Sequence, residues 1–126
     1  MRFRILLTAV VSVLFSSSLY AADAEGNYAI WGMGNASCHS YNKAREKDGT
    51  DEFRYYIMGY LTAYNVHQSE TYSISNLQEM PDIMAWFDDF CTNNAVHSFE
   101  SALANFISEH YEDRKKTLRQ KNPYGR

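Results

Sequence analysis

The stretch TDEFRYYIMGYLTAYN, residues 50–65, decides the fold class, because its apolar residues recur at helical spacing. A helix should begin at Thr50 or Asp51, and Asp51 and Glu52 lie where the positive end of a helix dipole favours carboxylates. Gly59 and Ala63, four residues apart, would let another helix approach closely. The core-facing positions repeat every 3.6 residues and are Phe53, Ile57, Tyr60, Leu61 and Tyr64.

A shorter helix is expected before this stretch and a polar connection after it. The preceding helix begins near Asn35 or Ala36. It should end at residues 48–49, where an Asp-Gly pair suits a helix C-terminus. Residues 72–76 are predicted to form a polar loop.

The next helix is predicted to begin near Glu79, because Pro81 is tolerated in a first helical turn. Ser75 and Gln78 have the spacing of a capping box, which leaves an earlier start open. A turn at residues 93–94 ends this helix. Its inward residues are Ile83, Phe87, Phe90 and Cys91, with Trp86 at the edge.

A last helix should begin near Ala95, run into the basic C-terminal residues and stop before Pro123. Its inward residues are Val96, Phe99, Leu103, Phe106, Ile107 and His110. Four helices with short connections predict an all-α fold, a small four-helix bundle.

The N-terminal residues have the three regions of a cleavable signal peptide. Arg2 and Arg4 form a basic start, residues 5–14 are mostly apolar, and small residues follow at 21–24. The apolar run is too short to span a bilayer. The expected organisation is a signal peptide at 1–21, cleaved between about 21 and 24, a helical domain at 25–120 and a flexible basic tail at 121–126.

Cys38 and Cys91 are the two cysteines, so one intramolecular disulfide can form. In the oxidising compartment that a secretory signal implies, pairing is the expected state. Closing the loop between them should stabilise the fold by about 4 kcal/mol through the entropy of the unfolded chain. The alternative is a free thiol activated by His39, which is disfavoured because helical neighbours point to different faces.

The charges divide the chain into an acidic body and a basic end. All fifteen acidic residues lie between Asp23 and Asp113 with only four basic residues, which gives this body a formal charge of −11. Residues 114–126 carry six basic side chains and no acidic one. An acidic surface keeps a domain soluble, and it also attracts a basic protein partner at long range. It disfavours nucleic acid as a partner, because phosphates are repelled.

The sequence contains no motif that identifies a reaction. His97 and His110, on one predicted helix, are about 220° apart and cannot share a metal ion. The WGMG segment at residues 31–34 lacks the third glycine of a dinucleotide-binding loop. Asp88 and Asp89 point in different directions, so they do not form a carboxylate pair. We therefore expect a non-enzymatic protein with no catalytic residue, no metal and no cofactor.

Tyrosines cluster around the helix at 50–65 and the loop that follows it. Tyrosine joins a large apolar body to a polar tip, which suits both a partner surface and the rim of a core, and both interpretations stay open. Exposed carboxylates at a rim would steer a basic partner. The candidate partner-binding residues are Tyr55, Tyr56, Tyr64, Tyr72, Asp88 and Asp89.

Three segments resemble a group of small secreted bacterial proteins: WGMG at 31–34 before Cys38, YIMGYLTAYN at 56–65, and WF at 86–87 before Cys91. The layout is similar to that of two periplasmic groups, the HdeA-type acid-stress chaperones and the Tai-type immunity proteins. The resemblance implies a periplasmic helical protein with one disulfide between helices. It also implies a non-enzymatic role in binding other proteins.

The expected partner is therefore another protein. It is a basic or amphipathic protein if the chain is an inhibitor or immunity protein, and unfolded clients if the chain is a stress chaperone. A homodimer is left open. No stable membrane insertion is expected once the signal peptide is removed.

Overall fold

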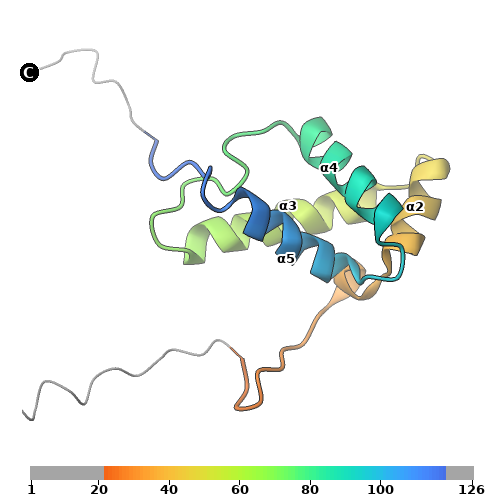
Figure 1. Cartoon of the computed structure of the whole chain (residues 1–126), viewed down its shortest axis with the longest axis horizontal. Coiled ribbons are helices and arrows are strands. Elements are labelled where there is room, and N and C mark those ends of the chain that lie inside the picture. The colour runs from red at the N-terminus through yellow and green to blue at the C-terminus, as the bar shows by residue number, and fades with distance from the viewer. Residues whose placement is uncertain (1–21, 119–126) are drawn as a thin grey trace, which may run out of the picture.

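The computed structural model describes residues 22–118, which form an all-α bundle. The elements are the 3₁₀ helix η2 (Gly32–Asn35) and the α-helices α2 (Cys38–Glu46), α3 (Asp51–His67), α4 (Met80–Asn93) and α5 (Phe99–His110). In Figure 1, α3 and α5 run across the middle, α4 lies above them and α2 lies at one end. The expected signal peptide and the tail at 121–126 lie outside the described residues.

No helix among the described residues is long and apolar enough to cross a membrane. The start of the N-terminal segment, residues 22–31, leads away from the helices in Figure 1, while its later part returns to them, since the Tyr28 hydroxyl reaches Glu100 on α5. The fold class predicted from the sequence, a four-helix bundle with one disulfide, is confirmed.

α3 has nearly the bounds that its periodicity predicts. Its N-cap is Thr50, and Phe53, Ile57 and Leu61 are its buried residues. The expected inward residues Tyr60 and Tyr64 are only partly buried and pack at the edge of the core. The strictly buried stripe is therefore narrower than the sequence suggests.

One aromatic ring from each α-helix meets at the centre of the core. The ring of Phe99 on α5 lies 5.1 Å from Tyr41 on α2, 4.8 Å from Phe53 on α3 and 5.2 Å from Phe87 on α4, measured between centroids. All four residues are buried. Stacked and edge-on pairs of this kind contribute about 0.5 to 1.5 kcal/mol each beyond the area they bury.

A disulfide holds α2 against α4. Cys38 and Cys91 are fully buried and paired, with their Cα atoms 4.8 Å apart, which confirms the expected bridge. Two side chains of α2 add polar contacts on the same side. Asn42 donates to the carbonyl oxygen of Cys91 at 3.0 Å, and the Tyr41 hydroxyl donates to Asp88 Oδ1 at 2.6 Å.

The expected start of the first helix, near Asn35 or Ala36, is wrong by two to three residues. The backbone makes a separate turn in η2, and α2 begins at Cys38 because the Ser37 side chain accepts a hydrogen bond from the backbone N–H of Ser40. The end near residues 48–49 is close to the observed C-cap at Lys47.

The expected start of the last helix near Ala95 is also wrong. The carbonyls of Ala95 and His97 accept hydrogen bonds from the start of α2, so this segment cannot be helical. Ser98 caps α5 through its side chain. Val96, which was expected to face inward, is 93% exposed.

The last helix does not run into the basic tail. α5 ends at His110, and the chain then turns so that Lys115 pairs with Ser73 through backbone hydrogen bonds of 2.9 and 3.0 Å. The guanidinium of Arg114 donates to Thr71 and lies over the ring of Tyr111. These tertiary contacts override the helical propensity of the sequence.

The connection between α3 and α4 is not the plain polar loop that was expected. Ile74 is fully buried, and its N–H donates to the side-chain oxygen of Asn65 at 2.8 Å. Thr71, Ser73 and Ser75 are buried beside it. This loop is therefore part of the core. On α4 the predicted helix start is confirmed, and Met84 is a buried residue that the sequence analysis left out.

We expect two glycine-to-alanine substitutions to act in opposite directions. A Cβ atom on Gly34 would lie 2.6 Å from Ile30 Cγ2 and 2.7 Å from Tyr56 Cζ, so Gly34→Ala should destabilise the protein by about 1 to 3 kcal/mol. A Cβ atom on Gly59 meets nothing within 4 Å, and α3 surrounds it on both sides, so Gly59→Ala should stabilise by up to about 1 kcal/mol.

Urea unfolding followed by circular dichroism measures both changes. Equal destabilisation by the two substitutions would contradict the close approach of Tyr56 to Gly34.

Candidate functional site

The outward side of α3 carries no charged side chain over twelve residues, from Tyr55 to Val66. Its exposed apolar residues include Tyr55, Met58 and Val66, at 62%, 46% and 73% exposure. Gly59, Thr62 and Ala63 are exposed between them. We call these six residues the α3 face. At 100° per residue they fall within one sector of the helix, so they form a continuous strip.

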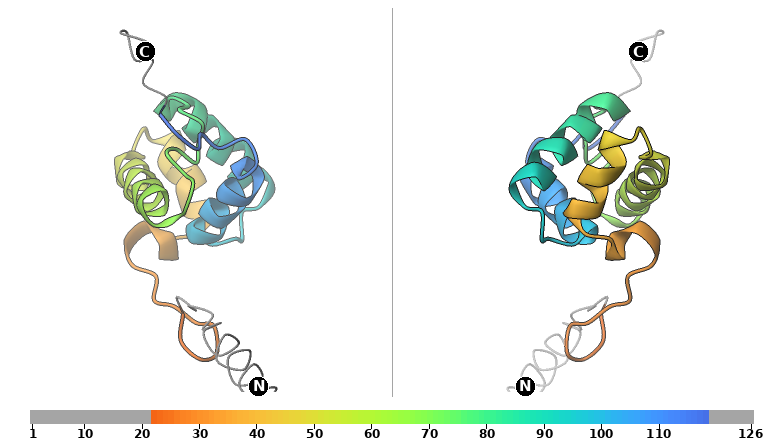
Figure 2. Two further views of the ribbon diagram at one scale, coloured as in Figure 1. Left: turned by 90° about the vertical axis from the view of Figure 1, so that its left-hand side faces the viewer. Right: turned by 90° about the vertical axis from the view of Figure 1, so that its right-hand side faces the viewer.

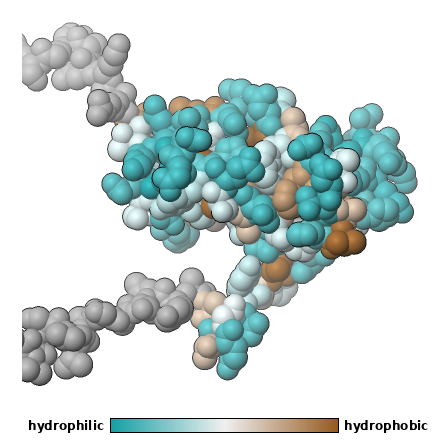
Figure 3. Space-filling view, in the orientation of Figure 1, coloured by the Kyte–Doolittle hydropathy of each residue, from teal (hydrophilic) through white to brown (hydrophobic). Residues whose placement is uncertain are grey.

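α3 lies at the outer edge of the bundle, and in both views of Figure 2 none of the other described helices covers its far side. The surface that Figure 3 shows, over α4 and α5, is mostly hydrophilic, with small separated hydrophobic areas. The α3 face is therefore a candidate contact surface, because exposed apolar patches rimmed by polar residues can mark such surfaces.

Charged residues flank the α3 face at both ends. Asp51 and Glu52 are exposed at the start of α3, and Glu70 is exposed just after its end. Asp51 is already paired with Arg54 at 3.1 Å, whereas Glu52 and Glu70 form no ion pair within the part of the chain that the structure describes. This arrangement has the apolar centre and charged rim of a protein interface.

The structure does not gather the four candidate tyrosines into one patch. Tyr55 belongs to the α3 face, whereas Tyr64 lies nine residues further on, about 180° around the helix. Tyr56 and Tyr64 are partly buried and pack against the core. Tyr72 is exposed in the loop after α3, where its N–H donates to the carbonyl of Lys115.

Asp88 is not the free steering charge that the sequence suggested. Its carboxylate accepts the Tyr41 hydroxyl and forms an ion pair with Arg45, so it fixes α4 to α2. Burial is the main cause that raises the pKa of Tyr41 well above its ordinary value, and the hydrogen bond to Asp88 is the second cause. Asp89 is exposed and remains available for steering.

A small apolar slot of about 240 Å³ adjoins the α3 face along its flank. It is lined by Tyr60, Ala63, Tyr64 and His67, which follow one another at helical spacing. Ala63 is shared with the α3 face, so one bulky side chain of a partner can enter the slot while its neighbours lie along the strip.

A buried carboxylate ties three parts of the chain together. Glu100 is 7% exposed and lies in the first turn of α5, where the helix dipole favours an anion. Its Oε1 atom accepts hydrogen bonds from the hydroxyls of Tyr28 at 2.9 Å and Tyr60 at 3.3 Å. These bonds satisfy the buried carboxylate and link the N-terminal segment and α3 to α5.

The tyrosines around Glu100 have raised pKa values. Burial is the main cause for Tyr60, and the charge of Glu100 adds to it, which raises the pKa of Tyr60 to about 12. Burial also raises the pKa of Tyr56. The hydrogen bond to Glu100 raises the pKa of Tyr28. The hydroxyls of Tyr28 and Tyr60 therefore keep their protons, and their hydrogen bonds to Glu100, to a higher pH than an ordinary tyrosine would.

Sequence reasoning missed most of the α3 face and the Glu100 cluster. The sequence does contain one signal for the α3 face: no residue from Tyr55 to Val66 is charged. Within residues 22–118, no group of three His, Cys, Asp or Glu side chains is arranged to hold a metal ion. Comparisons with protein-family models, curated proteins and solved structures find no significant match.

Tyr60 should make the protein less stable at alkaline pH. Its pKa in the fold, about 12, lies above the value of about 10 for an unfolded chain, so the native state keeps a proton that the unfolded state loses. The stability linked to this proton is complete below about pH 10 and is lost as the pH rises through about 12.

Melting temperatures measured from pH 8 to pH 12 test this linkage. Tyr60→Phe should flatten the decline between pH 10 and 12, while the control Tyr72→Phe, in the exposed loop, should follow the wild type. A decline that is identical in the wild type and in Tyr60→Phe would contradict it.

Proposed function

We propose that this chain is a periplasmic protein-binding module of the inhibitor or immunity type, exported by a signal peptide at residues 1–21. The observation that carries the proposal is the α3 face, an exposed and uncharged strip on a body of formal charge −11. The resemblance of the sequence to small secreted helical proteins supports the same class and compartment.

The rigid support of the α3 face favours specific binding. The opposite side of α3 is anchored in the core by Phe53, Ile57 and Leu61, and the disulfide fixes the helices around it. A surface on a well-packed helix loses little conformational entropy when a partner binds. Met58 adds adaptable packing, and Tyr55 supplies a large side chain with few rotatable bonds.

The partner that fits this surface is an amphipathic segment with basic residues at its margins. Its apolar side would lie along the α3 face and insert one side chain into the slot beside Ala63. Its basic residues would meet Glu52 and Glu70 at the two ends. The overall negative charge of the body would speed the approach of such a partner.

A charge placed in the α3 face should abolish binding. We expect Met58→Asp or Val66→Asp to weaken capture of the partner at least about tenfold, because the new carboxylate would be desolvated without a counter-ion. Tyr55→Ala should speed dissociation by about 10- to 100-fold if this ring is an anchor. Ala104→Asp, an exposed position on α5, is the matched control and should change little.

The measurement is affinity capture from periplasmic extract, followed by binding kinetics with the partner identified by mass spectrometry. Replacing Glu52 and Glu70 together by Gln should mainly slow association and weaken its dependence on salt. Saturable binding that is indifferent to Met58→Asp and Val66→Asp would refute the α3 face as the binding surface. Capture of many unfolded proteins without saturation would favour the chaperone alternative instead.

A further inference from the structure

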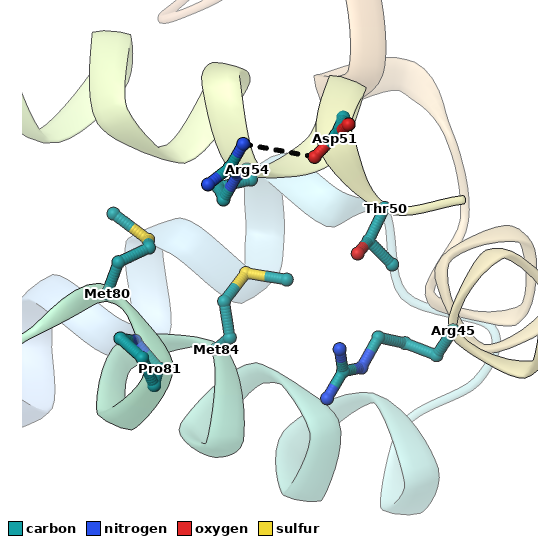
Figure 4. Close-up of a pocket in the computed structure, with 7 residues that line it drawn as sticks. All are labelled: Arg45, Thr50, Asp51, Arg54, Met80, Pro81 and Met84. Atoms are coloured by element: carbon teal, nitrogen blue, oxygen red, sulfur yellow. Dashed lines mark hydrogen bonds and ion pairs between the residues drawn. The ribbon is translucent and has the colours of Figure 1, made fainter. Parts of the chain in front are cut away.

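A second surface feature is a pocket of about 400 Å³ where α2 meets the starts of α3 and α4. Figure 4 shows the side chains around it. Arg45 comes from the end of α2, Thr50 and Arg54 from the start of α3, and Met80, Pro81 and Met84 from the first turns of α4.

The pocket gathers two arginines, each of them paired with an aspartate. The body has four basic residues, and two of them, Arg45 and Arg54, line this pocket. Figure 4 shows their guanidinium groups on either side of Met84. Within residues 22–118, the guanidinium of each makes one hydrogen bond, from Nη2 to Asp88 or to Asp51.

Most of the guanidinium donors therefore make no hydrogen bond within residues 22–118. An arginine offers five N–H donors in a fork that matches a carboxylate. Asp51 lies at the rim, and its carboxylate is already paired with Arg54. The Nε atom of Arg54 is buried and has no hydrogen-bond partner among the described residues, so a small turn of the guanidinium toward an acceptor would satisfy it.

Two helix N-termini border the same pocket. Thr50 is the N-cap of α3, a helix of 17 residues, and Met80 begins α4, a helix of 14 residues. Neither helix start has a side-chain cap hydrogen bond. The positive ends of both helix dipoles therefore add to the two arginines.

Apolar side chains form the rest of the wall. Met84 is buried, while Met80 is half-buried and Pro81 is exposed at the mouth. Methionine side chains adapt to irregular apolar groups. The pocket thus offers donors for an anion next to a compliant apolar wall.

We propose that this pocket binds a carboxylate carried on a short apolar chain, either a free acid or the carboxyl end of a peptide. The carboxylate pairs with the guanidinium groups of Arg45 and Arg54, and the apolar chain lies against Met80 and Met84. The inference does not rest on the proposed function, because it concerns a different class of ligand. The two surfaces meet at Arg54, whose guanidinium lies 5.1 Å from the centre of the Tyr55 ring on the α3 face.

The test is a titration of the oxidised, processed protein by ¹H–¹⁵N NMR with hexanoate, acetate and hexanol. Hexanoate should give saturable shifts at the amides around the pocket and bind at least fivefold more tightly than acetate or hexanol. Arg54→Gln should weaken hexanoate at least tenfold. The matched control Lys43→Gln, an exposed cation on α2 outside the pocket, should change it less than twofold.

Peptides with an apolar C-terminal residue, whose terminal carboxyl group is either free or amidated, distinguish a peptide end from a small free acid as the ligand. Tighter binding of the free-carboxyl peptide than of hexanoate assigns the site to a peptide end, and weaker binding assigns it to a small acid. Met80→Glu, which adds a like charge at the mouth, should abolish binding even if Arg54→Gln impairs folding. Equal binding of hexanoate and hexanol, or equal effects of Arg54→Gln and Lys43→Gln, would overturn the proposal.

Discussion

The ring of Phe99 is the contact on which the rest of the bundle depends. It touches one aromatic ring from each of the other three α-helices. Ser98, immediately before it, caps α5, and its backbone pairs with Ser37, the residue before α2. Packing at this point fixes the relative positions of all four helices at once. Because protein interiors are close-packed, a smaller residue here would leave a cavity that every helix borders.

The division of α3 into two unlike sides follows from that arrangement. Phe53 must reach the central rings, and this sets the rotation of the helix, so Ile57 and Leu61 turn inward and Tyr55, Met58 and Val66 turn outward. The outward residues are apolar although the core does not need them. In a chain whose body is otherwise rich in carboxylates, this strip is the surface that the proposed partner would contact.

The sequence predicted the parts of the fold that depend on local periodicity. The bounds of α3, the start of α4 with Pro81 in its first turn, and the pairing of the two cysteines all follow from spacing and residue type. The errors at Ala95, at the end of α5 and at residues 72–76 have one common cause. In each case backbone groups pair with a segment far away in the sequence, and no local pattern records that pairing.

The candidate site was predicted only in part for the same reason. Tyrosine content pointed to α3, but the direction in which each ring points depends on tertiary packing.

The disulfide closes a covalent ring that contains α2, α3 and α4 and leaves α5 outside. The helix that carries Phe99 is thus held to the other three described α-helices by packing and hydrogen bonds and not by the cross-linked loop. The N-terminal segment also lies outside the ring, and none of residues 22–31 is buried, so the hydrogen-exchange openings of lowest energy should begin there, with release of Tyr28 from Glu100. In such a partly open state the three ring-bound helices would stay near one another, and recovery would need the return of one short terminal element rather than a search by the whole chain.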